Sequence, residues 1–172
     1  SGKYHLSEKM GFIGLAGGGG GLGDKVVVDK RWVHPIGDIP LDEAALIEPL
    51  SVGHHAVVRS GVVAGQVALV GGAGPIGLLT AAVLKGMGVT TIVSELSLAR
   101  KDKAWESGVA DHVLDPSKED VKARVLEITG GLGADVAFEC AGVNVVLDAL
   151  LDALKPTGVL VNVSIWGRPA TV

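Results

Sequence analysis

Three glycines within one short segment would let a polypeptide backbone approach a phosphate group closely. Gly72, Gly74 and Gly77 follow the apolar run at residues 67–70 and precede an apolar stretch with helical spacing. In a strand, turn and helix of this kind, the first glycine permits the tight turn, the second admits a diphosphate, and the third lets the helix pack against the strand. The helix N-terminus adds free N–H groups and a positive dipole. Segment 72–77 therefore predicts a dinucleotide diphosphate site, with a plain tight turn as the alternative.

An acidic residue ends the next apolar run along the chain. Glu95 lies 18 residues after Gly77, where a carboxylate can accept hydrogen bonds from the ribose hydroxyls of adenosine and would repel the 2′-phosphate of NADP. Arg100 follows and could bind such a phosphate, but an acidic residue at the end of this strand usually outweighs it. We therefore predict NAD as the cofactor, with a purely structural role as the alternative for Glu95.

Two further segments follow apolar runs and should lie beside the glycines. They are Cys140, Ala141 and Gly142 after the fourth run, and Val163 and Ser164 at the end of the fifth. Ligands of parallel sheets bind at the carboxyl ends of strands, so we expect these loops to line the cofactor cleft. Cys140 has no basic neighbour in sequence, which favours a small buried hydrophobic residue over a nucleophile. We assign no catalytic residue within the chain.

The elements that must position these residues alternate regularly from residue 67 onward. Short apolar runs are separated by longer amphipathic stretches, and this alternation predicts an α/β protein with a doubly wound parallel sheet of the Rossmann type. The runs are VALV, TIV, HVL, DVAF and VLVNV, and the amphipathic stretches cover residues 76–87, 98–107, 119–128 and 143–154.

The chain before this sheet has a different pattern. Residues 25–29 and 31–34 are short β-branched runs, which we interpret as the remnant of a β domain within residues 1–40. A helical stretch follows, with an expected kink at Pro49. The neighbouring Glu48 is a carboxylate in an apolar stretch, so we expect it to meet a cation or a hydrogen-bond donor, with a helix cap or a salt bridge as the alternative.

Composition narrows the possible partners. The 172 residues carry a formal net charge of -4, so there is no basic stripe for a nucleic acid or an anionic membrane. No apolar run of about 18 residues is present, and the first residues lack the layout of a signal peptide. A single cysteine excludes an internal disulfide framework and a multi-cysteine zinc site. We expect a cytoplasmic protein without nucleic-acid or membrane partners.

Four segments together resemble the zinc-dependent medium-chain alcohol and polyol dehydrogenases, and within them the group of 2,3-butanediol and sorbitol dehydrogenases. The segments are IPLDEAALIEPLSVGHHAVVRSG, VALVGGAGPIGL, FECAGV and VNVSIWGRPATV. Members of this family are longer, so the resemblance implies a fragment. Residues 1–40 would be the remnant of an N-terminal β-barrel catalytic domain, and residues 41–172 an NAD-binding domain truncated at its C-terminal end.

The resemblance also implies a chemistry for the complete enzyme. Its catalytic zinc would be held by a Cys, a His and the Glu of the EP motif, which matches Glu48, while the other two ligands have no counterpart here. The enzyme would be a homo-oligomer that transfers hydride between NAD and a small secondary alcohol or vicinal diol of the 2,3-butanediol and acetoin type. We expect this chain alone to bind NAD and to show little dehydrogenase activity. The alternatives are a sorbitol or other polyol dehydrogenase, and a non-catalytic NAD-binding module.

The motifs and the resemblance together give one set of expected cofactor contacts. These are Gly72, Gly74, Pro75, Ile76, Gly77, Glu95, Arg100, Cys140, Ala141, Gly142, Val163 and Ser164.

Overall fold

The computed structural model describes residues 4–15 and 19–171, which fall into two compact units, Ser1–Pro40 and Leu41–Val172. The described part of the first unit contains only two 3-10 helices, η1 (Tyr4–Leu6) and η2 (Lys30–Trp32), and no strand. The β-branched runs at 25–29 and 31–34, interpreted as the remnant of a β domain, form no strand within the described residues. A strand needs a neighbour to pair its backbone N–H and C=O groups, and these runs have none. Their origin in a catalytic barrel stays a prediction.

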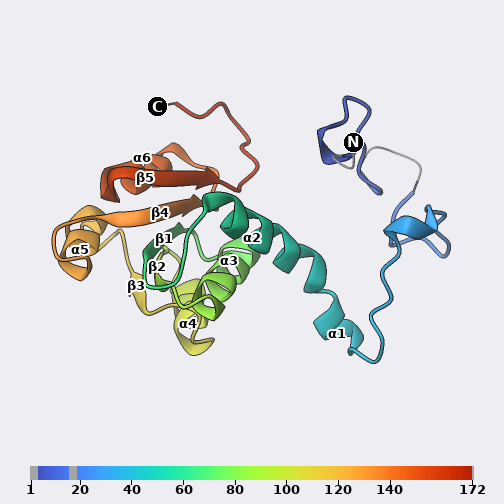
Figure 1. Ribbon diagram of the computed structural model, residues 1–172, viewed down its shortest axis with the longest axis horizontal. Helices are drawn as coiled ribbons and strands as arrows, with labels where there is room; N and C mark the ends of the chain where they lie inside the picture. The colour runs from blue at the N-terminus through green and yellow to red at the C-terminus, as the bar shows by residue number, and fades with distance from the viewer. Residues whose placement is uncertain (1–3, 16–18, 172) are drawn as a thin grey trace. The chain divides into compact units, whose positions relative to one another are not determined.

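The second unit contains a five-stranded parallel sheet with the order β3-β2-β1-β4-β5 (Figure 1). The strands are β1 (Val67–Gly71), β2 (Thr90–Ser94), β3 (His112–Leu114), β4 (Ala134–Glu139) and β5 (Leu154–Asn162). The helices are α1 (Leu41–Ala44), α2 (Ile47–Ser60), α3 (Pro75–Gly86), α4 (Leu98–Glu106), α5 (Val121–Ile128) and α6 (Asn144–Ala153). The predicted alternation of strands and helices is confirmed. None of the helices in the described residues is long and apolar enough to cross a membrane.

Helices cover both faces of the sheet, which explains why the strands are apolar without alternation. Successive strand residues point to opposite faces, and Leu69 and Val70 of β1 accordingly belong to different cores. The core under α2, α3 and α4 contains Val57, Val70, Leu84, Val93, Ala104 and Phe138. The core under α5 and α6 contains Leu69, Ile92, Val125, Ala137 and Leu150. The sheet is therefore doubly wound, as predicted.

The kink expected at Pro49 is a complete break between α1 and α2. In one continuous helix, Pro49 could not donate to the carbonyl of Ala45 and its ring would clash with that carbonyl. The chain instead makes a turn at residues 45–46, and α2 restarts with the Leu50 N–H donating to the Leu46 carbonyl at 2.9 Å. Pro49 then lies in the first turn of α2, where no N–H donor is needed.

The strand β5 begins earlier than the predicted run because it contains an irregularity. Ala134 pairs with Leu154 but Val136 pairs with Val159, so extra residues of β5 are looped out. Thr157 has a φ of 67°, which is a strained value for a β-branched residue. Beyond this bulge the register is regular up to the pair Glu139 and Asn162. The chain segments that leave β4 and β5 therefore start side by side.

Candidate functional site

A cleft of about 690 Å³ lies at the carboxyl ends of the central strands. Gly71 at the end of β1, Ser94 at the end of β2 and Cys140 directly after β4 all line it, together with residues of α6 and the start of α5. Strand order reverses at β1, because the chain runs from β1 to β2 on one side and returns to β4 on the other (Figure 1). Ligands of open α/β sheets bind at such a point. This cleft is therefore the candidate functional site.

The cleft gathers half of the residues expected to contact a cofactor. Gly72, Gly74, Glu95, Arg100, Cys140 and Ala141 line it. Pro75, Ile76, Gly77, Gly142, Val163 and Ser164 are not among the lining residues, and contact of the whole set with a cofactor stays a prediction. Part of the wall is apolar and was not among the predicted contacts; it is formed by Leu96, Val143, Val145, Val146 and Ala149. The apolar start of α6 after a strand-end loop is the signal that would have found most of it.

Each glycine of the loop has a different geometric reason. Gly72 has a φ of 97°, which only glycine adopts readily, and its N–H donates to the Ser94 carbonyl at 2.8 Å. A Cβ on Gly77 would lie 2.0 Å from the Gly72 carbonyl oxygen, so α3 can start here only with glycine. A Cβ on Gly74 would meet no atom within 4 Å. Nothing in the chain itself requires glycine there, and the open side of Gly74 is where a ligand could approach the backbone.

Glu95 fixes the rim of the cleft. Its side chain is 8% exposed, with Oε2 accepting from the Ala73 N–H and Oε1 from the Ser97 N–H, both at 2.8 Å. The Arg100 guanidinium lies 3.9 Å from Oε2 and is 61% exposed. The carboxylate thus joins the glycine loop to the residue before α4, which is a structural role. Each of its oxygens can accept a further hydrogen bond, so this role leaves it able to bind a hydroxyl in the cleft.

A second strand-end carboxylate was missed by the sequence analysis. Glu139 ends β4 and is fully buried. Its Oε1 accepts from the Ala141 N–H at 3.0 Å and the Gly142 N–H at 2.8 Å, and its Oε2 accepts from the Ser164 hydroxyl. The signal was present, because a single acid closing an apolar strand had already singled out Glu95.

Cys140 directly follows Glu139 and lines the cleft, and its thiol is not ionised at neutral pH. Burial, with a smaller contribution from the charge of Glu139, raises the pKa of the Cys140 thiol to about 12. The thiol is therefore protonated at neutral pH, whereas a nucleophilic cysteine needs the thiolate. This agrees with the prediction of a small hydrophobic residue.

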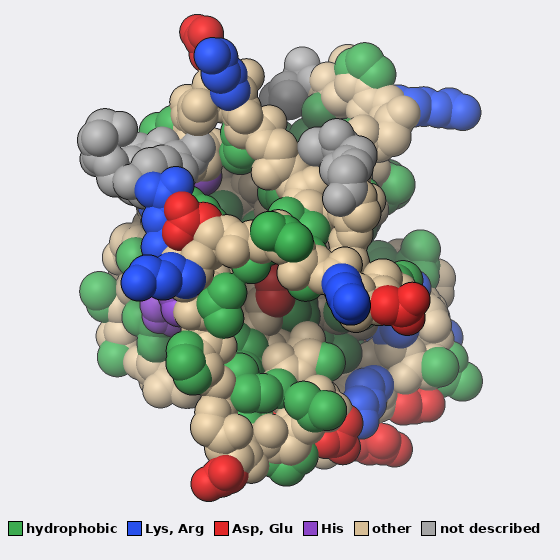
Figure 2. Space-filling model, turned by 90° about the vertical axis from the view of Figure 1, so that its right-hand side faces the viewer, with side chains coloured by type: hydrophobic (Ala, Val, Ile, Leu, Met, Phe, Trp, Pro, Cys, Tyr) green, Lys and Arg blue, Asp and Glu red, His purple; other side chains and the backbone are tan. Residues whose placement is uncertain are grey.

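Glu48 lies apart from these features, in the first turn of α2, and is exposed. Water solvates the exposed carboxylate, so no burial cost arises in the described residues, and the expectation that Glu48 meets a cation or a hydrogen-bond donor stays a prediction. Its apolar neighbours Leu46, Ile47 and Leu50 are also exposed. Figure 2 shows that hydrophobic side chains lie among charged ones on the face that it displays. Among the residues that the structure describes, no group of three His, Cys, Asp or Glu is placed to hold a metal.

Residues 75–172 match a family described as zinc-binding dehydrogenase. The chain is 68% identical to an (R,R)-butanediol dehydrogenase of Neisseria gonorrhoeae, covering 99% of this chain and 48% of that protein. It is 38% identical to human sorbitol dehydrogenase, covering 99% and 49%. The chain thus spans about half the length of the curated relatives it matches.

Two solved structures extend the comparison. The crystal structure of 2R,3R-butanediol dehydrogenase from Bacillus subtilis is similar with a TM-score of 0.90 at 44% identity, covering 100% of this chain and 50% of that one. A structure from Sinorhizobium meliloti 1021, of the zinc-binding dehydrogenase type and bound to NADP, has a TM-score of 0.64 at 33% identity, covering 72% and 37%.

Proposed function

The chain belongs to the zinc-binding dehydrogenase family, and from this premise we propose that it forms the NAD-binding part of a dehydrogenase acting on a secondary alcohol or vicinal diol. The observation that carries the proposal is the position of Glu95, which is pinned beside the glycine loop inside the cleft. The residues present fit a nicotinamide dinucleotide, and when bound this cofactor supplies the carbon that takes or gives a hydride.

The cleft offers a place for each part of the dinucleotide. Gly74 opens α3, so the diphosphate would meet free N–H groups and the positive end of the helix. Glu95 would accept from the adenosine ribose. Leu96, directly after Glu95, lines the cleft and is 62% exposed, and it would flank the adenine ring. The other half of the cofactor would then extend toward the ends of β4 and β5, across the point where strand order reverses.

Glu95 is also the reason for proposing NAD rather than NADP. Its two oxygens are held by backbone N–H groups of Ala73 and Ser97, so the carboxylate is not free to swing away from the ribose position. A 2′-phosphate there would face a fixed negative charge, opposed by the exposed guanidinium of Arg100. Membership of the family does not decide this point, because one related structure is bound to NADP.

The substrate and the metal are proposals for the protein that carries this domain. The higher identity to butanediol dehydrogenase than to sorbitol dehydrogenase supports a vicinal diol such as 2,3-butanediol, or acetoin in the reverse direction, over a polyol. The described residues do not fit a zinc site, so we derive no step through zinc and retain Glu48 only as a candidate ligand. We expect this chain alone to show little activity. A cytoplasmic location and a homo-oligomeric state also remain predictions.

Calorimetric titration of the 172-residue chain with NAD⁺ and NADP⁺ tests the proposal. We expect selectivity for NAD⁺ of about tenfold or more, because like charges a few Å apart at a protein surface repel by roughly 1 to 4 kcal/mol. Glu95→Gln should reduce this selectivity, whereas Glu106→Gln, on the exposed end of α4, should retain it while removing the same charge. Absence of binding to either cofactor would contradict the proposal, and equal affinity would contradict the role of Glu95.

A further inference from the structure

We infer that Glu139 is a positioning residue for the nicotinamide half of the cofactor site. The inference rests on the proposed binding of a nicotinamide dinucleotide in the cleft. Glu139 does not line the cleft and is fully buried, so it can act only through the residues that it holds. Those residues belong to the two loops that leave the ends of β4 and β5.

The side chain of Glu139 joins the two loops directly. Its carboxylate accepts from the N–H groups of Ala141 and Gly142 in the loop after β4, at 2.8 to 3.1 Å. The same carboxylate accepts from the hydroxyl of Ser164 in the loop after β5. Its hydrogen bonds therefore come from both sides of the junction.

The backbone of Glu139 holds the same two loops together. Its carbonyl oxygen accepts from the N–H groups of Val163 at 2.9 Å and Ser164 at 3.1 Å. Gly142 has a φ of 71°, and a Cβ on it would lie 3.1 Å from the Ile165 carbonyl oxygen, so the loops are in close contact. Loss of the carboxylate would keep the backbone hydrogen bonds of Glu139 and remove its side-chain connection between the two loops.

Packing alone does not explain an acidic residue at this position. Burial of a carboxylate is costly unless it is paired or fully hydrogen-bonded. None of the ion pairs formed among the described residues involves Glu139, so backbone N–H groups and one hydroxyl must satisfy its charge. A residue that only filled space at the end of β4 would be apolar like Val136, Ala137 and Phe138, the three buried residues before it. We attribute the carboxylate to the conformation that it imposes on the two loops.

The topology assigns these loops to one half of the cofactor. Glu95 and Arg100 follow β2 and would hold the adenosine half. A dinucleotide crosses the sheet at the point where strand order reverses, so its other half lies over β4 and β5. Ala141 of the first loop lines the cleft wall on that side. A change at Glu139 should therefore affect a ligand that carries nicotinamide more than one that carries only adenosine phosphate.

The test compares the binding of NADH and AMP to the chain and its variants, with thermal unfolding measured in parallel. Glu139→Ala leaves the partly buried N–H groups of Ala141 and Gly142 without acceptors, and we expect it to weaken NADH binding by about tenfold while AMP affinity changes less than twofold. Glu139→Gln keeps an acceptor for both N–H groups, and the Ser164 hydroxyl can turn to accept from the new amide, so it should restore most of the NADH affinity.

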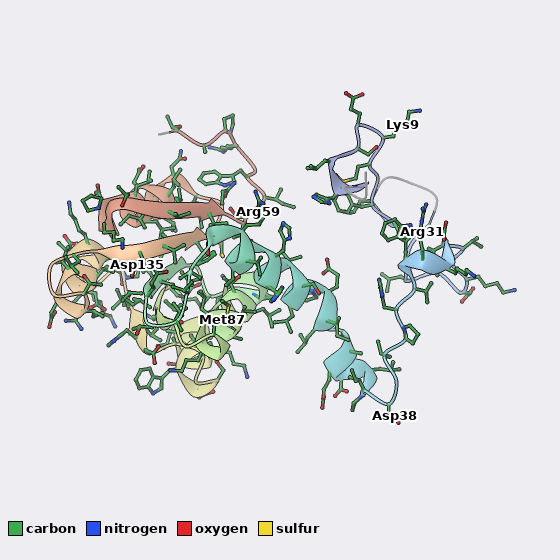
Figure 3. The ribbon with its side chains drawn as sticks, in the orientation of Figure 1. Lys9, Arg31, Asp38, Arg59, Met87 and Asp135 are labelled. Carbon is green, nitrogen blue, oxygen red and sulfur yellow. The ribbon has the colours of Figure 1, made fainter. Side chains whose placement is uncertain are left out.

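Asp135→Ala is the matched control. Asp135 lies near the start of β4 (Figure 3), where its carboxylate accepts from the Val67 N–H at 2.8 Å and pairs with Lys155. This substitution should lower the unfolding temperature without changing the ratio of NADH to AMP affinity, because it lies at the opposite end of the sheet from the cleft.

The binding results separate a failure of the positioning role of Glu139 from a failure of the proposed function. If Glu139→Ala weakens NADH and AMP equally, or weakens neither, the positioning role is wrong while the proposed function stands. If the unmodified chain binds neither ligand, the proposed function fails and the inference fails with it. If Glu139→Ala does not fold, Ser164→Ala removes only one side of the connection and must still weaken NADH more than AMP. Equal effects of that variant on both ligands would overturn the inference.

Discussion

Gly74 and Gly77 are separated by one turn of chain, yet substitution by alanine should affect different properties at the two positions. A Cβ on Gly77 would lie 2.0 Å from the Gly72 carbonyl oxygen, where real contacts are longer than 3.0 Å. The backbone must therefore move by about 1 Å, and such overpacking costs about 3 kcal/mol. For a unit of this size, that cost lowers the unfolding temperature by roughly 10 °C.

Gly74→Ala should leave the stability nearly unchanged. Gly74 has a φ of -70° and a ψ of -180°, which alanine adopts freely, and the new Cβ would have no atom of the described residues within 4 Å. Alanine lowers the conformational entropy of the unfolded chain, which stabilises the fold, but it is a poorer N-cap than glycine. The two effects have opposite signs and each amounts to less than about 1 kcal/mol. The Cβ would instead stand where a diphosphate approaches the N–H groups of α3. Loss of charge-assisted hydrogen bonds should weaken NAD⁺ binding by about tenfold or more.

The assay combines thermal unfolding followed by circular dichroism with calorimetric titration of NAD⁺. Gly86→Ala serves as the matched control, because Gly86 is an exposed residue at the end of the same helix with open space at its Cβ position. It should be slightly stabilising and should bind NAD⁺ like the unmodified chain. Unchanged NAD⁺ affinity of Gly74→Ala would contradict the proposed diphosphate site, and an unchanged unfolding temperature of Gly77→Ala would contradict the steric role of Gly77.

Three further predictions concern residues around the cleft. The Lys101 ammonium beside Asp115 holds the pKa of that carboxyl well below its usual range. The ionised carboxylate therefore stabilises the folded chain above the unfolded pKa of about 3.9, and this contribution is lost as the pH falls below that value. Asp115→Asn should therefore be less stable than the unmodified chain at neutral pH and should lose less stability in acid. Urea unfolding at several pH values measures this, and a parallel fall of the unfolding free energy in the two proteins would contradict it. Cys140 should react with a thiol reagent at neutral pH only after denaturation, and rapid labelling of the native chain would show that its raised pKa is wrong. Asp120→Ala removes the acceptor for the Ala123 N–H at the start of α5 and should cost about 1 kcal/mol in urea unfolding, whereas Asp120→Asn should retain most of the cap.

The sheet could be predicted from sequence because local and global signals agree along most of it. Each apolar run is short, each amphipathic stretch is long, and both faces of the sheet are covered, so strand and helix patterns do not compete. Residues 25–34 show where this reasoning stops. Their β-branched composition indicates strands, but strand formation depends on a neighbour that composition cannot reveal. The early start of β5 was missed for a related reason, because the bulge at Thr157 depends on pairing with β4.

The glycine loop was more predictable than the carboxylates around it. A positive φ at Gly72 and a short contact at Gly77 are consequences of backbone geometry, which the spacing of the motif already encodes. The surroundings of Glu48 depend on what packs against α2. The structure leaves that carboxylate exposed, and no sequence pattern within the helix could have settled this.

Glu95 and Glu139 show how burial separates two roles of the same residue type. Glu95 directly follows β2 and Glu139 ends β4, the two strands adjacent to β1, and both accept hydrogen bonds from backbone N–H groups of a loop at the carboxyl edge. The loop after β5 donates the Ser164 hydroxyl to Glu139, which is fully buried, whereas Glu95 lines the cleft and keeps 8% exposure. A carboxylate that reaches the cleft can bind a hydroxyl of the ligand, and one that is fully enclosed can only shape the wall around it. Replacing the charge should therefore alter the choice between NAD⁺ and NADP⁺ at Glu95, but the affinity for the nicotinamide half at Glu139.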